Sequence, residues 1–194
     1  MRIACVSEGE TEYSCVPKLV GRLGHQVIHN SCLYGCNTDW EKTIEFKVLP
    51  QVRTAALKNP DKILVVVDRE RQDRCCPQLA ATAAAIVGQG LQAVNLVSDF
   101  SIIVSDRVFE VIVMADYELV DKLGILTQAA EQHLGVDLDG KNPLSLVRGM
   151  LKPGCKYDKK KHGAALASKM RLSDAAVLAR SRTLRKLVDV LDIG

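Results

Sequence analysis

The sequence has 194 residues, of which 47% are hydrophobic, 25% charged and 4% aromatic, and its formal net charge is +3. This length fits one domain of ordinary size, and the apolar fraction excludes intrinsic disorder, which requires lower hydrophobicity and higher net charge. No apolar run approaches the roughly 20 residues that span a bilayer, and the N-terminal residues do not form a secretory signal. We therefore expect a cytoplasmic protein whose seven cysteines are reduced.

The charges are distributed unevenly along the chain. Residues 1–140 contain 13 Lys and Arg against 19 Asp and Glu, whereas residues 141–194 contain 13 against 4. A basic tail after an acidic first part suggests a polyanion partner. On charge alone, however, basic helices that merely keep one face in water are the better interpretation.

The first elements alternate between strand and helix. Residues 2–6 form an apolar, partly β-branched run that predicts a strand. Apolar positions at three- and four-residue spacing predict a helix over 11–22, and a short strand is expected at 26–29. A second helix is expected over 40–57, where Pro50 should break or kink it.

The middle of the chain contains the clearest strand. Residues 62–67 are continuously apolar after Lys62, which is typical of a strand covered on both faces in a parallel sheet. An Ala-rich helix is predicted from 77 to 87, followed by strands at 93–97 and 101–104. Residues 108–114 are ambiguous between a strand and a buried helix.

From residue 117 onward the pattern is helical. The predicted fold class is therefore α/β, a parallel sheet flanked by helices, over residues 1–120. Residues 121–194 are expected to form a basic helical extension packed on that core as one compact unit. The predicted helices of this second part lie at 117–123, 125–134, 143–151, 164–170 and 181–191.

Acidic residues follow the predicted strands. In open α/β sheets the functional site lies at the carboxyl ends of the strands, where Glu8 and Glu12 follow the first strand and Asp68 and Glu70 follow the central one. Glu110 adjoins another apolar run. Gathered carboxylates raise each other's pKa unless a cation neutralises them, and Mg²⁺ prefers such oxygen ligands. Three further acids are interpreted as solvated caps or turn residues: Glu10, Asp73 and Asp116.

Three segments in this order resemble a known family. Residues 5–12 read Cys-Val-Ser-Glu-Gly-Glu-Thr-Glu, which looks like the opening motif of Toprim-fold proteins. Residues 65–70, Val-Val-Val-Asp-Arg-Glu, resemble the second Toprim motif with Glu in place of its second Asp. Residues 109–116 and the tail at 157–163 and 181–184 also match. The chain is most similar to small standalone bacterial Toprim-like proteins related to OLD-type nucleases.

The resemblance implies a Toprim-like fold and a metal-dependent nuclease or related phosphodiester-acting enzyme. Glu8, Asp68 and Glu70 would hold Mg²⁺ or Mn²⁺, and Glu8, Glu12 and Glu110 would form the catalytic acid cluster. The Asp-to-Glu change at Glu70 adds one methylene and moves that carboxylate outward. The implied partner is nucleic acid, with DNA as the expected form, and no membrane. A homodimer and a protein partner encoded nearby are compatible with this interpretation.

A lysine-rich segment follows at 152–162. Five phosphate contacts there would make nucleic-acid binding steeply salt-dependent. A solvated loop is the alternative, and it is about equally supported. With one aromatic residue in the segment, base stacking is not supported. The candidate phosphate-binding residues are Lys152, Lys156, Lys159, Lys160 and Lys161.

Two other functions fit parts of the pattern. The first is a Toprim-like binding or regulatory protein that has lost catalysis and works in a phage-defence or mobile-element system. The second is a phosphate-accepting receiver domain in which Asp68 would be phosphorylated, although the basic helical tail has no role there. The spacing of Cys32 and Cys36 is compatible with two of the four ligands of a zinc site, and His25 and His29 are nearby in the sequence. Buried or loop thiols are nevertheless the better interpretation.

Overall fold

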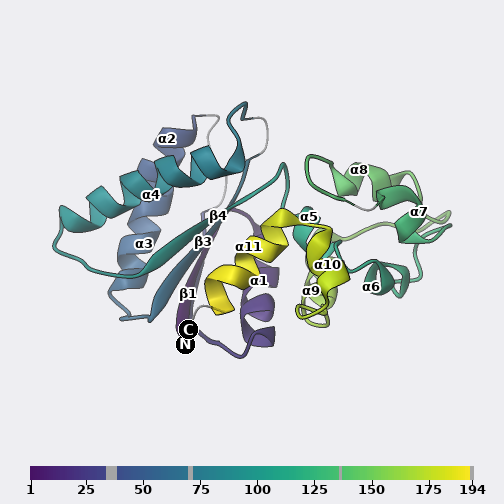
Figure 1. The fold of residues 1–194 in the computed structure, drawn as a ribbon, viewed down its shortest axis with the longest axis horizontal. Coiled ribbons are helices and arrows are strands. Elements are labelled where there is room, and N and C mark those ends of the chain that lie inside the picture. The colour runs from purple at the N-terminus through teal and green to yellow at the C-terminus, as the bar shows by residue number, and fades with distance from the viewer. Residues whose placement is uncertain (34–38, 70–71, 136, 193–194) are drawn as a thin grey trace.

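A computed structural model describes residues 1–33, 39–69, 72–135 and 137–192. These residues form a four-stranded parallel sheet with the spatial order β2-β1-β3-β4, flanked by helices (Figure 1). The strands are β1 (Arg2–Ser7), β2 (Gln26–Cys32), β3 (Lys62–Asp68) and β4 (Phe100–Ser105). The predicted α/β fold class is thus confirmed.

The two central strands are buried because helices cover both faces of the sheet. All residues of β3 from Lys62 to Val67 are buried, as its continuous apolar run predicted. Since the strands are parallel, their carboxyl ends lie at one edge. Ser7 of β1 pairs with Val66 of β3, and Asp68 pairs with Ser105 of β4. Residues that follow these strands therefore meet.

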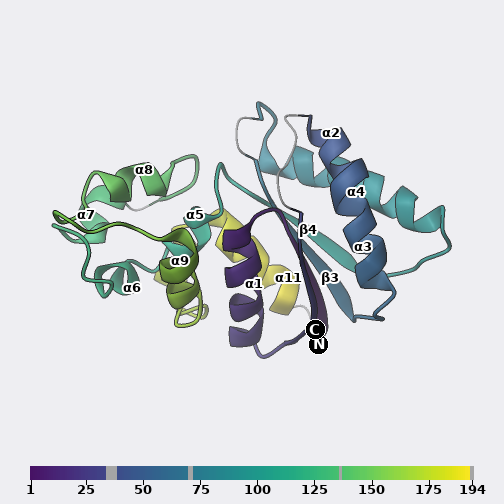
Figure 2. The ribbon, with the colours of Figure 1, turned by 180° about the vertical axis from the view of Figure 1, so that it is seen from behind.

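Each face of the sheet has its own helical layer and apolar core. One face packs against α1 (Glu10–Arg22) and α11 (Arg182–Asp192). The other is covered by α3 (Leu49–Ala56) and α4 (Cys76–Gln92), and the views from both sides show the two layers (Figures 1 and 2). The last helix is strongly amphipathic and buries Leu184, Leu187 and Leu191. It returns the chain to the sheet beside α1.

The predicted helix over residues 40–57 is a run of three helical segments. They are α2 (Trp40–Thr43), the π-helical η1 (Ile44–Val48) and α3. Pro50 stands in the first turn of α3, directly after the π-helical turn. Proline has no N–H to donate to the carbonyl four residues earlier, and its ring clashes with that carbonyl in an α-helix. The wider π-helical turn relieves this clash. The chain therefore continues as a helix across Pro50.

The remaining helices follow β4. The ambiguous segment at 108–114 contains the short buried helix α5 (Glu110–Val113). Next, α6 (Tyr117–Asp121), α7 (Ala130–Leu134) and α8 (Pro143–Arg148) lie together beyond α5, away from the sheet (Figures 1 and 2). Then α9 (Lys159–Ala167) packs against α1, and α10 (Ala175–Ala179) leads into α11. No helix in the described part of the chain is long and apolar enough to cross a membrane.

One predicted strand was wrong. Residues 93–97 form a turn and irregular chain between α4 and β4, although they are mostly apolar. The helix continues to Gln92, and Asn95 then adopts a left-handed conformation with φ 55°, which a strand cannot contain. Val97 is 99% exposed.

The role expected for Asp116 also needs correction. This side chain is not solvated but fully buried, at 0% exposure. Arg171, between α9 and α10, donates from Nε to Asp116 Oδ2 (3.0 Å) and from Nη2 to Asp116 Oδ1 (2.7 Å). The bidentate pair joins the start of α6 to the C-terminal helices. By contrast, Glu10 and Asp73 are exposed as expected, and Glu10 forms an ion pair with Lys160.

Two glycines within α4 should respond in opposite ways to alanine substitution. At Gly88 an added Cβ would lie 3.9 Å from Phe100, an ordinary contact, so Gly88→Ala should raise the free energy of unfolding by about 0.5–1 kcal/mol. At Gly90 the Cβ would lie 2.6 Å from Leu49 Cδ1. Because Leu49 would have to move, Gly90→Ala should lose this gain and lower the free energy of unfolding by about 1 kcal/mol. Urea denaturation of both variants measures the difference, and an equal gain in both would contradict this packing.

Candidate functional site

Glu8 and Asp68 lie together at the carboxyl-terminal ends of the neighbouring strands β1 and β3. Glu8 follows β1 and Asp68 ends the neighbouring strand β3. The Asp68 backbone N–H donates a hydrogen bond of 2.6 Å to Glu8 Oε2. The Glu8 backbone N–H in turn donates to the Val66 carbonyl at 3.1 Å. The register of the two strands thus fixes both acidic residues in place.

Glu12 folds back over the start of α1. Gly9 is the residue before the helix, and a Cβ there would lie 2.8 Å from Glu12 Oε2. The absence of a side chain at Gly9 therefore leaves room for this carboxylate, which is 5% exposed. Burial raises the pKa of Glu12 to about 7, and the negative charges of Glu110 and Glu8 add to the effect.

Glu110 enters the same group from a different part of the chain. It begins α5 and is 2% exposed. Its Oε1 lies 3.2 Å from Nζ of Lys159, the first residue of α9. That helix is capped by Asp158, which accepts a hydrogen bond of 2.8 Å from the Lys161 N–H. The cap and the packing of α9 on α1 place Lys159 beside the acidic residues.

Asp68 lies where burial and neighbouring acidic residues act in the same direction. Burial raises its pKa well above the ordinary value, and the charges of Glu12, Glu8 and Glu110 raise it further. A hydrogen bond from the Phe109 backbone opposes this shift. Within the described residues, the buried Oδ1 atom of Asp68 has no hydrogen-bond partner. Glu8, Glu12, Asp68 and Glu110 are called the acidic cluster below.

Two serines at the same edge were not identified from the sequence. Ser7 ends β1 and Ser105 ends β4, and both are 0% exposed. Their hydroxyl oxygens have no hydrogen-bond partner within the described residues. A serine directly after an apolar strand is the only sequence signal for them, and it is too common to select a site.

The other site residues predicted from the sequence are Glu70 and the five lysines. Glu70 lies outside the described residues. Of the lysines, Lys159 reaches the acidic cluster and Lys160 forms an ion pair with exposed Glu10, whereas Lys152 donates to the Gly124 carbonyl at 2.8 Å. Lys156 and Lys161 are exposed. The five lysines therefore do not converge on one point.

The acidic cluster has a donor set that suits a divalent cation. Across the described residues, no three His, Cys, Asp or Glu side chains converge as ligands of one ion. Mg²⁺, however, is usually held by one or two carboxylates, with water and phosphate oxygens at its other positions. Glu8 and Asp68 supply two neighbouring carboxylates, and Asp68 Oδ1 is buried without a partner among those residues. The residues present therefore fit such an ion.

Two cysteines lie beside the acidic cluster: Cys32 Sγ is 3.8 Å from the Glu8 carbonyl oxygen, and Cys15 is close enough to Glu12 and Glu110 for their charges to raise its pKa. Cys32 ends β2, and Cys36 lies outside the described residues. His25 instead hydrogen bonds through Nε2 with the Leu191 carbonyl at 2.9 Å. Burial raises the pKa of both Cys5 and Cys15 to about 12, so these thiols are poor nucleophiles at neutral pH.

Together, the fold and the acidic cluster define an α/β protein with carboxylates gathered at the ends of parallel strands. The chain is similar to the C-terminal region of the Xanthomonas campestris pv. campestris OLD protein phased with iodine, at 15% identity and a TM-score of 0.43, covering 99% of this chain and 96% of that one. The same region phased with mercury gives 15% identity and a TM-score of 0.42, with coverage of 99% and 97%. No family model and no curated protein matches the sequence.

The raised pKa of Glu12 predicts a pH-dependent stability. An acid whose pKa is higher in the folded than in the unfolded state destabilises the fold once it ionises. In EDTA, ionisation of Glu12 alone should lower the free energy of unfolding by up to about 3 kcal/mol as pH rises from 4.5, its ordinary pKa, to above 7. Glu12→Gln should remove most of this loss in urea unfolding at the two pH values. Glu10→Gln, an exposed change in the same helical turn, should keep the wild-type slope, and an unchanged slope in Glu12→Gln would refute the assignment.

Proposed function

We propose that the protein is a metal-dependent nuclease, or a related phosphodiester-acting enzyme, that works through the acidic cluster. The observation that carries this proposal is the hydrogen bond from the Asp68 backbone N–H to the Glu8 carboxylate, which holds the two acidic residues together where their strands end, while Asp68 Oδ1 has no hydrogen-bond partner within the described residues. Mutually repelling carboxylates in a buried position are expensive unless they bind a cation. The Toprim-like motifs around these residues agree with this function.

In this proposal Glu8 and Asp68 hold Mg²⁺ or Mn²⁺, with Glu70 as a further candidate ligand. A bound divalent ion stabilises the charge that develops on the phosphate and lowers the pKa of a water molecule. Glu12 contributes a carboxyl group whose pKa of about 7 suits proton transfer near neutral pH. Glu110 keeps Lys159 at the edge of the cluster through their ion pair.

Lys159 is the cation best placed to contact a substrate phosphate. Its side chain is 47% exposed although the ammonium group lies beside buried Glu110, so the substrate can reach it from solvent. Lys156 and Lys161 are exposed close to it in sequence and would add contacts to the nucleic-acid backbone. We infer nucleic acid, with DNA as the expected form, as the substrate.

One observation favours the second candidate, a Toprim-like binding or regulatory protein without catalysis, which would act in a phage-defence or mobile-element system. The Lys159 ammonium already neutralises part of the acidic cluster at 3.2 Å from Glu110. An internal cation of this kind can replace a metal ion and leave a fold that only binds. The two candidates differ in their response to Mn²⁺.

Cleavage of supercoiled plasmid and of labelled single strands tests the proposal. Parallel reactions contain Mg²⁺, Mn²⁺ or EDTA, at low salt so that phosphate contacts are strong. We expect cutting with the metal ions and none in EDTA. Binding of the same DNA without cutting in any metal would support the second candidate, and cutting that persists in EDTA would contradict a metal-dependent site.

A further inference from the structure

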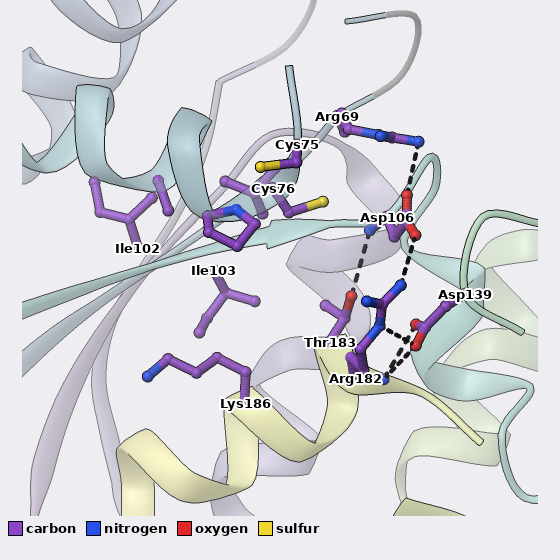
Figure 3. A pocket seen from close by; sticks show the side chains of 13 residues that line it. Arg69, Cys75, Cys76, Ile102, Ile103, Asp106, Asp139, Arg182, Thr183 and Lys186 are labelled. Atoms are coloured by element: carbon purple, nitrogen blue, oxygen red, sulfur yellow. Dashed lines mark hydrogen bonds and ion pairs between the residues drawn. The ribbon is translucent and has the colours of Figure 1, made fainter. Parts of the chain in front are cut away.

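A second candidate site lies at the outer edge of the sheet. A cavity of about 360 Å³ opens beside β4, between the start of α4 and α11 (Figure 3). Ile102 and Ile103 of β4 and Pro77 and Ala80 of α4 are among the residues that line it. Its walls are thus largely apolar. None of the four residues of the acidic cluster lines this cavity.

Charged residues border the apolar walls, and most of them are paired with each other. Arg69 Nη2 lies 2.8 Å from Asp106 Oδ1, and Arg182 Nε lies 2.6 Å from Asp139 Oδ2. The dashed lines in Figure 3 show both pairs. These two arginines and two aspartates therefore neutralise one another.

Two cationic side chains at the cavity have a nitrogen that is not paired within the described residues. Lys186 of α11 lines the cavity, and in the described part of the chain its ammonium group forms neither an ion pair nor a hydrogen bond. Arg69 Nε is buried, with no acceptor in the same part of the chain. A buried donor without an acceptor is costly, and a ligand with anionic oxygens would satisfy it. The cavity therefore combines apolar walls with an exposed ammonium group, Lys186, and a buried guanidinium nitrogen of Arg69 that lies well away from it (Figure 3).

We propose that this cavity binds a small organic anion with an apolar body and one carboxylate or phosphate group. Its volume lies within the range of small-molecule sites, about 300–1,000 Å³, and such sites are mainly apolar with a few polar groups that fix orientation. The apolar body packs on Ile102, Ile103 and Ala80, and the anionic group binds Lys186. This ligand site is additional to the nuclease function and does not depend on it.

Amide chemical-shift titration of the full-length protein in EDTA tests the site. The probes are 1-naphthyl phosphate and 1-naphthoic acid, which separate the two anion types, with uncharged 1-naphthol for comparison. We expect saturable shifts at residues 101–106 and 182–187 with at least one anion, and weaker binding of naphthol. Lys186→Met should weaken the anion about tenfold, the effect of losing one partly desolvated charge contact, and leave naphthol binding unchanged.

Two further variants make the test specific. Lys169→Met removes another exposed lysine and should not alter binding. Ala80→Phe fills the cavity and should abolish binding of all probes while amides elsewhere keep their positions. Absence of saturable shifts at the cavity, or equal anion affinity in Lys186→Met, would overturn the proposal. So would a concentration-dependent dimer blocked by Ala80→Phe, because the edge of β4 would then belong to a second copy of the chain.

Discussion

Asp68→Asn is expected to lower Mn²⁺-dependent DNA cleavage about 10²–10³-fold, the usual effect of removing one electrostatic contact to the transition state. Asparagine has nearly the same shape, and its backbone N–H still donates to Glu8 Oε2. The substitution therefore removes a charge without removing the contact that positions Glu8. Glu8→Gln should act similarly, since the glutamine oxygen can still accept that hydrogen bond. Plasmid cleavage rates at fixed Mn²⁺ measure both effects.

Stability separates loss of chemistry from loss of fold. Because burial and, to a smaller extent, the neighbouring negative charges raise the pKa of Asp68, its ionised form destabilises the metal-free fold. Asp68→Asn should thus unfold at a higher urea concentration than wild type in EDTA at neutral pH while losing activity. Asp73→Asn, an exposed change outside the acidic cluster, should alter neither property. Full activity in both Asp68→Asn and Glu8→Gln would remove the acidic cluster from the mechanism.

The largest change in stability is expected from Arg171→Met. The substitution leaves Asp116, which is 0% exposed, as a buried charge without its bidentate partner. Breaking a buried ion pair from one side costs about 3–5 kcal/mol, and the partial exposure of Arg171 places the expected loss near the lower end, at about 3 kcal/mol. Urea denaturation at neutral pH provides the measurement. Arg185→Met, which alters an exposed arginine of α11, should change stability by less than about 0.5 kcal/mol.

The loss of stability in Arg171→Met should become smaller as pH falls. Burial by itself would raise the pKa of Asp116, but the hydrogen bonds and charge of Arg171 outweigh it, so the pKa is lowered from 3.8. A lowered pKa stabilises the fold above 3.8, and this contribution is lost as pH falls through the folded-state value. The difference in the free energy of unfolding between wild type and Arg171→Met should therefore become smaller at acidic pH. A gap that is constant across this pH range would show that the loss comes from packing rather than from charge.

The sheet could be predicted because its central strands have a distinctive pattern. The buried run in β3 and the shorter one in β1 are apolar without alternation, which identifies parallel strands covered on both faces. Residues 93–97 have a similar composition and were wrongly predicted as a strand. Only the left-handed turn at Asn95 and the length of α4 decide against it, and neither follows from hydrophobicity.

The acidic cluster could be predicted only in part. Glu8 and Asp68 follow strands, so the parallel topology alone brings them together. Glu110 and Lys159 meet through the packing of helices far apart in sequence, which no local pattern specifies. The burial of Asp116 likewise depends on Arg171, 55 residues away. The cavity beside β4 depends on even more dispersed segments, and its charges pair only in the folded chain.

Titration of Mn²⁺ into the protein, followed by electron paramagnetic resonance of the free ion, tests the central claim most directly. The acidic cluster should bind Mn²⁺ saturably in wild type, and Mg²⁺ should compete. Asp68→Asn and Glu8→Gln should each weaken that binding at least about tenfold, whereas Asp73→Asn should bind as wild type does. Mn²⁺ binding of unchanged affinity in both cluster variants, or no saturable binding in folded wild type, would contradict a metal site formed by Glu8 and Asp68.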